Sequence, residues 1–324
     1  MKRPVFVLGS PRSGTTLLYH MLLSAGGFAV YRTESNVYNI LGPRFGDFSV
    51  MRNKSELMKV WLRSKLFKVS GLDPEDITSK VLEQCKSHGD FLQIVMGEIA
   101  RKQHVDRWAE CTPEHIAYLR EIKQDISDAL IVHIIRDGRD VALSLDKLGW
   151  IRPFPWDKDK SRLVAGLFWE WIVGKGREYG RAIGRDYMEV RFEELVTNPR
   201  PVLAQVGRFI EHDLDYDRIQ QAAIGSVAKP NSSFAAESAS DAFNPVGRWK
   251  YAFRNGELHE LERLIGRLLN DLSYPLADTP GAGGSGQRLA CMRAAYRGYF
   301  DSKLWLKKNT RLGRFLVSTD LSWL

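Results

Sequence analysis

VFVLGSPRSGTTLLYH, residues 5–20, is the stretch that decides the fold of this 324-residue chain. It opens with four apolar residues, breaks at Gly9-Ser10-Pro11, and resumes after Gly14 with apolar residues at helical spacing. This order predicts a strand, a glycine-bounded loop and a helix. Because the N–H groups at the start of a helix lack intrahelical partners and the helix dipole is positive there, such a loop is suited to bind an anion.

The spacing of Gly9-x-x-x-x-Gly14-Thr15-Thr16 is that of the nucleotide-binding P-loop, with one departure. Thr15 stands where that motif has lysine, and the loop carries its positive charge at Arg12 instead. In P-loop enzymes the lysine reaches the terminal phosphates of ATP, so its absence argues against ordinary phosphoryl transfer.

A second anion motif follows the apolar run 129–135, ALIVHII, whose composition is typical of a buried parallel strand. The strand ends in Arg136, where nucleotide hydrolases commonly have a metal-binding aspartate, and the following predicted helix carries Ser144. A guanidinium at this position is suited to a second phosphate. The sequence therefore predicts two anion sites with no metal between them.

Composition is that of a globular protein, with 44% hydrophobic and 27% charged residues and a net charge of +8. Residues 288–324 hold eight basic and two acidic residues, so the rest of the chain is nearly balanced, which argues against a nucleic-acid partner. The three widely spaced cysteines indicate a reducing compartment. Since no leader or long apolar span precedes the first strand, we expect a cytoplasmic protein.

Alternating strand and helix patterns predict an α/β fold, a P-loop-type parallel sheet flanked by helices. Further strands are expected at 28–31, about 107–111 and 187–191, and a long helix at 161–183. Residues 41–107 predict three or four inserted helices that would form a lid or wall above the sheet. Glu34, after the predicted strand 28–31, falls near the active crevice, because ligands of parallel sheets lie beyond the strands' carboxyl ends. His115, near a helix start, is a second candidate for a functional role.

The polar segment 228–250 is predicted to be a surface loop that covers the site. The main domain is expected at residues 1–277, followed by a glycine-rich linker at 278–287 and a basic, amphipathic segment at 288–324. Three interpretations of that last segment stay open: a peripheral membrane contact, a dimerisation arm, or a helix folded back on the body.

With both anion motifs, the chain resembles the sulfotransferases that use 3′-phosphoadenosine 5′-phosphosulfate, in the branch with tyrosylprotein, carbohydrate and many bacterial members. Residues 9–16 are similar to the family's 5′-phosphosulfate loop and residues 136–144 to its 3′-phosphate motif. The cofactor-binding residues that the resemblance implies are Arg12, Ser13, Gly14, Thr15, Thr16, Arg136, Ser144, Phe192, Ser232, Phe234, Arg248 and Lys250.

Within these matches, Phe192 takes the place of a tyrosine that contacts the adenine, Ser232-Ser233-Phe234 resembles a segment against the base, and Gly247-Arg248-Trp249-Lys250 resembles the cofactor cover. Glu110-Cys111-Thr112-Pro113 resembles the family's Glu-Lys-Thr-Pro, with Cys111 where lysine is usual.

The resemblance implies an in-line transfer of a sulfuryl group to an acceptor hydroxyl, with adenosine 3′,5′-bisphosphate as product and no metal. Arg12 would stabilise the developing charge, and Glu34 would be the base, with His115 as the next candidate. The acceptor, a small molecule, carbohydrate, lipid or peptide, stays open. Two alternatives are a P-loop small-molecule kinase or NTPase and a non-catalytic nucleotide-binding module at a membrane surface.

Overall fold

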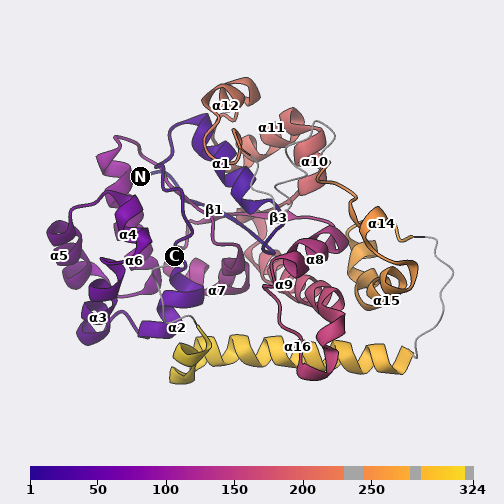
Figure 1. Cartoon of the computed structure of the whole chain (residues 1–324). Coiled ribbons are helices and arrows are strands. Elements are labelled where there is room, and N and C mark those ends of the chain that lie inside the picture. Colours follow the sequence, from indigo (N-terminus) through magenta and orange to yellow (C-terminus); the bar gives the residue numbers. More distant parts are fainter. Residues whose placement is uncertain (230–243, 278–285, 318–324) are drawn as a thin grey trace.

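The computed structural model describes residues 1–229, 244–277 and 286–317. At its centre lies a four-stranded parallel sheet in the order β2-β1-β3-β4 (Figure 1). The strands are β1 (Val5–Gly9), β2 (Ala109–Glu110), β3 (Leu130–Ile135) and β4 (Tyr187–Arg191). The fold is therefore the predicted α/β class, with helices on both faces of a parallel sheet.

Adjacent strands β1 and β3 bring the two anion motifs together. They pair in parallel from Val5 with Leu130 to Gly9 with Ile134, so both strands end at the same edge of the sheet. Every residue of both strands is buried, as their continuous apolar composition predicts. The loops that follow them, 10–14 and 136–137, consequently lie side by side.

Successive residues of β1 face two separate hydrophobic cores. Val5 and Val7 join a core with α1 (Thr15–Ala25), and Phe6 and Leu8 join the larger core on the opposite face. The smaller core also contains residues of α10 (Phe192–Thr197), α11 (Pro199–Ile210) and α12 (Tyr216–Ala222), and the larger one residues of α7 (Leu119–Asp125), α8 (Gly138–Lys147) and α9 (Ser161–Ile183).

The predicted strand at 28–31 is wrong. Phe28 forms a single parallel bridge with Arg107, and the ladder stops there. The side chain of Gln103 takes its place, accepting from the Val30 N–H at 2.7 Å and donating to the Val30 carbonyl at 3.0 Å. The Gln103 side chain, distant in sequence, thus forms the hydrogen bonds that a neighbouring strand would have formed with Val30. Local strand propensity cannot predict such a contact.

Five helices form the predicted insertion, whereas the sequence predicted three or four. They are α2 (Gly42–Phe45), α3 (Met51–Trp61), α4 (Lys65–Ser70), α5 (Pro74–Gln84) and α6 (His88–Lys102). A π-helical turn at Val37–Leu41 precedes them, and short 3₁₀ turns lie at Pro113–Tyr118, Pro155–Lys160 and Gly184–Asp186. The insertion lies beside the sheet, and its first helix, α2, packs near the C-terminal segment (Figure 1).

The C-terminal part of the described chain comprises α14 (Trp249–Ala252), α15 (Asn255–Asp271), α16 (Gly286–Asn309) and a 3₁₀ turn at Arg311–Leu316. Helix α16 runs along one side of the molecule, packed on α9 and α15, and reaches the insertion at its far end (Figure 1). The basic segment thus lies on the body of the protein. Among the helices of the described residues, none has the length and hydropathy to cross a bilayer.

Candidate active site

The loop between β1 and α1 forms a glycine-dependent anion cradle. Gly14, just before α1, has φ 94°, and a Cβ built there would lie 2.3 Å from a ring carbon of Phe192. No side chain in the described part of the chain caps this end of the helix, so its first N–H groups are available to a ligand. Arg12 adopts φ 71°, which turns the loop sharply, and the Ser13 N–H donates to the Ser10 carbonyl at 3.1 Å.

Ser13 adds an unpaired donor to this cradle. Its hydroxyl is fully buried and finds no hydrogen-bond partner within the described part of the chain. Since a buried polar group without a partner costs free energy, the position fits a ligand oxygen that would complete the hydrogen bond.

Arg136 extends from the end of β3 toward this loop. Its Nη1 donates to the Arg12 carbonyl at 3.1 Å, and its guanidinium lies 4.6 Å from the ring centroid of Phe192. The Nε of Arg136 is buried and has no partner among the described residues. The Nε of Arg12 donates to the Ser144 hydroxyl on α8 at 3.0 Å. Arg12, Arg136, Ser144 and Phe192, four predicted ligands, therefore form one continuous site.

The two guanidinium groups repel each other. Burial and then the charge of Arg136 lower the pKa of Arg12. Burial also lowers the pKa of Arg136, with a further contribution from Arg248 that nearby carboxylates oppose. A cluster of partly buried like charges is stabilised by an anion between them.

Asp140 anchors the segment that covers this cluster. Its carboxylate accepts from the backbone N–H of Gly247 at 2.8 Å and of Trp249 at 2.9 Å. Arg136 also donates to the Pro245 carbonyl. This places Arg248 at the site edge, near Arg136, while the Lys250 amine lies 5.8 Å from the Trp249 ring centroid. Ser232 and Phe234, two further predicted ligands, lie outside the described residues.

Glu34 lies beside Arg12 at the surface of the site. Partial removal from water and the negative charges of Glu110 and Glu114 raise its pKa to about 7, and Arg12 opposes this rise. The residue remains exposed, so an acceptor could reach its carboxylate. A carboxylate with a pKa near neutrality is matched to the task of a general base.

His115, in contrast, is fully buried and engaged at both ring nitrogens. Its Nε2 accepts from the Tyr38 N–H at 3.2 Å, which places the ring proton on Nδ1, 3.2 Å from Glu110. Burial opposes ionisation of Glu110, but His115 beside it and hydrogen bonds from His115, Thr112 and Ser35 lower its pKa to about 2. Of the two candidate bases, His115 is therefore buried and engaged, whereas Glu34 is exposed.

Cys111 occupies the place of the family's lysine and cannot supply a positive charge. It is buried, and that burial, followed by the charges of Glu34 and Glu110, raises the pKa of its thiol, which a hydrogen bond with Thr15 opposes. Thr15 is itself buried at the start of α1, and Thr16 follows on the same helix.

Sequence reasoning missed three residues of this region: Asp140, Glu114 and Trp150. Asp140 lies inside the predicted 3′-phosphate motif, so its position alone could have marked it. Glu114 acts on the pKa of Glu34, and the Trp150 ring centroid lies 5.8 Å from the Arg12 guanidinium. No local pattern signals these last two residues, because their roles depend on long-range packing.

Comparisons with known proteins agree with this geometry. The model of the Sulfotransferase family matches residues 4–216, more than half of the chain. No curated protein sequence matches the chain.

Two solved structures share its fold. The sulfotransferase domain from the Synechococcus PCC 7002 olefin synthase has a TM-score of 0.54 at 17% identity, over 86% of this chain and 98% of that one. The sulfotransferase domain from the curacin biosynthetic pathway has a TM-score of 0.50 at 15% identity, over 91% and 98%. The two anion motifs, their junction at one sheet edge and the extent of the family match lead to one conclusion: the chain belongs to the Sulfotransferase family.

Proposed function

We propose that this protein transfers a sulfuryl group from 3′-phosphoadenosine 5′-phosphosulfate to the hydroxyl of an acceptor. One observation carries the proposal: Arg12 of the first anion loop contacts both Ser144 and, through its carbonyl, Arg136 of the second. A single ligand with two separate phosphate groups would satisfy both motifs at once. We assign the activity to residues 1–277.

Different residues at the junction of the two motifs would bind different groups of the sulfuryl donor. The N–H groups at the start of α1, with the side chains of Arg12, Ser13, Thr15 and Thr16, would bind the 5′-phosphosulfate. Arg136 and Ser144 would bind the 3′-phosphate. The Ser13 hydroxyl and the Arg136 Nε support this fit, since each is a buried donor without a partner among the described residues. By resemblance, Phe192, Ser232, Phe234, Arg248 and Lys250 would hold the nucleotide base and close the cover.

In the transfer step, Glu34 accepts the proton of the acceptor hydroxyl as the acceptor oxygen bonds to sulfur. The bond from sulfur to the bridging oxygen breaks in line, its electron pair stays with the 5′-phosphate, and adenosine 3′,5′-bisphosphate leaves. Arg12 and the loop N–H groups are preorganised donors for the charge on that oxygen. A metal is not required, because these donors supply the positive charge.

The acceptor could be drawn from small molecules, carbohydrates, lipids or peptides that carry a hydroxyl group. We place the reaction in the cytoplasm, a reducing compartment, in keeping with cysteines that are all free: Cys85, Cys111 and Cys291.

Calorimetry with two nucleotides tests the proposal. We expect adenosine 3′,5′-bisphosphate to bind without a divalent cation and ATP with Mg²⁺ to bind far more weakly. Adenosine 5′-monophosphate is the matched control, because it lacks only the 3′-phosphate assigned to Arg136. Tight, Mg²⁺-dependent binding of ATP without a response to the bisphosphate would instead favour a kinase or NTPase.

A further inference from the structure

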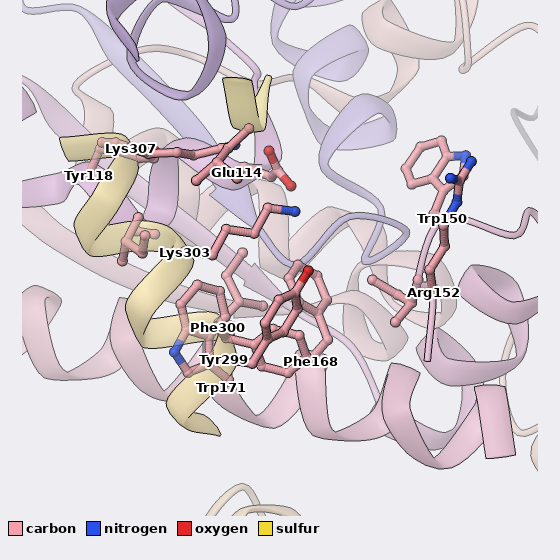
Figure 2. Close-up of a pocket in the computed structure, with 15 residues that line it drawn as sticks. Glu114, Tyr118, Trp150, Arg152, Phe168, Trp171, Tyr299, Phe300, Lys303 and Lys307 are labelled. Atoms are coloured by element: carbon pink, nitrogen blue, oxygen red, sulfur yellow. The ribbon is translucent and has the colours of Figure 1, made fainter. Parts of the chain in front are cut away.

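A cavity of about 600 Å³ opens between the loop 150–152, α9 and α16. Figure 2 shows a floor of aromatic rings from α9 and α16, with Glu114 and Lys307 on one side and Trp150 and Arg152 on the other. Its aromatic lining comprises Tyr118, Trp150, Phe168, Trp171, Tyr299 and Phe300. This volume is typical of a site for a small molecule.

Helix α16 is a fixed wall of this cavity. Its buried residues, Leu289, Met292, Tyr296 and Phe300, share one face of the helix. The Phe300 ring lies 5.4 Å from that of Trp171 between centroids, and Asp301 accepts a hydrogen bond of 2.9 Å from the Trp171 Nε1. These contacts with α9 set the position of the next turn of α16, which carries Lys303.

The cavity adjoins the proposed transfer site at two points. Trp150 lies against the Arg12 guanidinium, with 5.8 Å to the ring centroid. Glu114 lines the cavity and is close enough to Glu34 to raise its pKa. An acceptor bound here would therefore have one end near Glu34 and Arg12.

Lys303 gives the cavity a binding group for an anion. Figure 2 shows its side chain extending from α16 into the open space, toward the side of Trp150 and Arg152. Lys307, one turn further, donates to the Asn39 carbonyl at 3.3 Å. It also lies close enough to Glu114 for that carboxylate to oppose the lowering of its pKa by burial. Lys303 and Arg152 form neither a hydrogen bond nor an ion pair with any described residue. The lining thus contains three cations against one acid, and the half-buried Lys303 has no ion-pair partner among the described residues.

We propose that this cavity is the acceptor site and that it selects an aromatic hydroxyl compound carrying an anionic group, which Lys303 binds. The aromatic walls stack on the acceptor's ring system. The ammonium group of Lys303 forms a charge-assisted hydrogen bond to its carboxylate. The assignment of the hydroxyl end rests on the proposed function, whereas anion binding at Lys303 does not.

Binding of two matched probes, 6-hydroxy-2-naphthoate and its carboxamide, tests this inference without any nucleotide. Titration calorimetry should give a dissociation constant for the acid about 10–100-fold below that for the amide, since a charged hydrogen bond is worth about 1.5–3 kcal/mol. Lys303→Met should remove this preference and leave the amide's affinity unchanged. Arg297→Met is the control: it removes one charge from the exposed part of the same helix and should keep the preference.

Equal affinity of the acid and amide for the wild type, or equal loss of both in Lys303→Met at an unchanged melting temperature, would overturn the inference. Absence of binding by both probes would overturn it as well. An acid preference that depends on Lys303, in a protein that transfers no sulfuryl group, would support this site and contradict only the proposed function.

Discussion

Arg12 and Ser144, 132 positions apart in the sequence, are joined by a hydrogen bond of 3.0 Å from the Arg12 Nε to the Ser144 hydroxyl. This bond links the loop after β1 to the helix after β3. Together with the Arg136 bond to the Arg12 carbonyl, it makes the two anion motifs one site. The affinity for nucleotide and the rate of transfer should therefore depend on different members of one contact network.

Arg136→Ala should weaken binding of adenosine 3′,5′-bisphosphate by about 10–100-fold, because a hydrogen bond to a charged group contributes about 1.5–3 kcal/mol. Affinity for adenosine 5′-monophosphate should change much less, since that nucleotide lacks the phosphate in question. Calorimetry measures both constants. Arg200→Ala, which removes a guanidinium from an exposed pair with Asp217, is the control and should leave both unchanged. An equal loss for the two nucleotides would show that Arg136 does not bind the 3′-phosphate.

Arg12→Ala should abolish sulfuryl transfer, and Arg12→Lys should recover only part of it. Lysine keeps the charge but cannot reproduce both the planar guanidinium and the Nε bond to Ser144. Single-turnover measurements with bound donor would separate this effect from affinity. Ser144→Ala, which leaves the Arg12 charge in place, should retain more transfer than Arg12→Lys. Wild-type rates in Arg12→Ala would remove Arg12 from the mechanism.

The Glu34 carboxylate should give turnover a pH dependence with a midpoint near 7, where its raised pKa lies. Since the base must be ionised, turnover should rise with pH through this range and level off above it. Glu34→Gln should lower turnover by about 10²–10⁴-fold, the usual contribution of a general base, and remove this limb of the profile. Donor affinity should be spared. A variant with near wild-type turnover would contradict the assignment.

The raised pKa of Glu34 also predicts that Glu34→Gln increases the stability of the fold at high pH, although it lowers turnover. A carboxyl group whose pKa is raised in the folded state disfavours folding once the pH exceeds its unfolded value. Glu34→Gln should therefore raise the melting temperature at pH 8 and have no such effect at pH 3, where the carboxyl is protonated in both states. This readout does not depend on any substrate.

The sheet and its two anion loops could be predicted from the sequence because their signals are local. The continuous apolar runs of β1 and β3 indicate buried parallel strands, and the glycines and arginines follow directly at the strand ends. Adjacency of the two loops then follows from the rule that parallel strands end at one edge. The sequence alone could not distinguish the two candidate bases, Glu34 and His115. The contacts of His115 with Tyr38 and Glu110, which bury it, are visible only in the structure.

The acceptor cavity could not be predicted in the same way. The apolar face of α16 is visible in the sequence, but the sequence does not say which surface that face contacts. Packing of Phe300 on Trp171 and of Tyr296 on Phe154 decides this, over more than a hundred residues of sequence separation. Only this docking brings Lys303 near Trp150 in one cavity.

Alkylation should distinguish the cysteines without affecting turnover. Cys291 is exposed, whereas Cys85 and Cys111 are buried. Burial, with the charge of Asp90, raises the pKa of Cys85 to about 12, and burial also raises the pKa of Cys111. Because the thiolate is the reactive form, iodoacetamide should modify only Cys291 in the native protein. Intact mass and peptide mapping would identify the site. Rapid modification of Cys111 with loss of turnover would contradict its burial beneath the loop.

Arg139 should be essential to the stability of the protein. Unlike Arg136, three residues earlier, it should affect nucleotide binding only indirectly, through the fold. It is fully buried, donates to Asp137 at 2.7 and 3.0 Å and to Glu262 of α15 at 2.6 Å, and lies 3.5 Å from the Trp249 ring centroid. Arg139→Met would leave two buried carboxylates without a counter-ion. The expected loss in free energy of unfolding is about 3–5 kcal/mol, measured by urea denaturation.

A second substitution tests whether that loss comes from uncompensated charge. Adding Glu262→Leu to Arg139→Met should recover part of it, since one of the two orphaned charges is then absent. Where the Arg139→Met variant remains folded, its affinity for adenosine 3′,5′-bisphosphate should fall less than that of Arg136→Ala. A loss of affinity equal to that of Arg136→Ala, at unchanged stability, would instead make Arg139 a phosphate ligand.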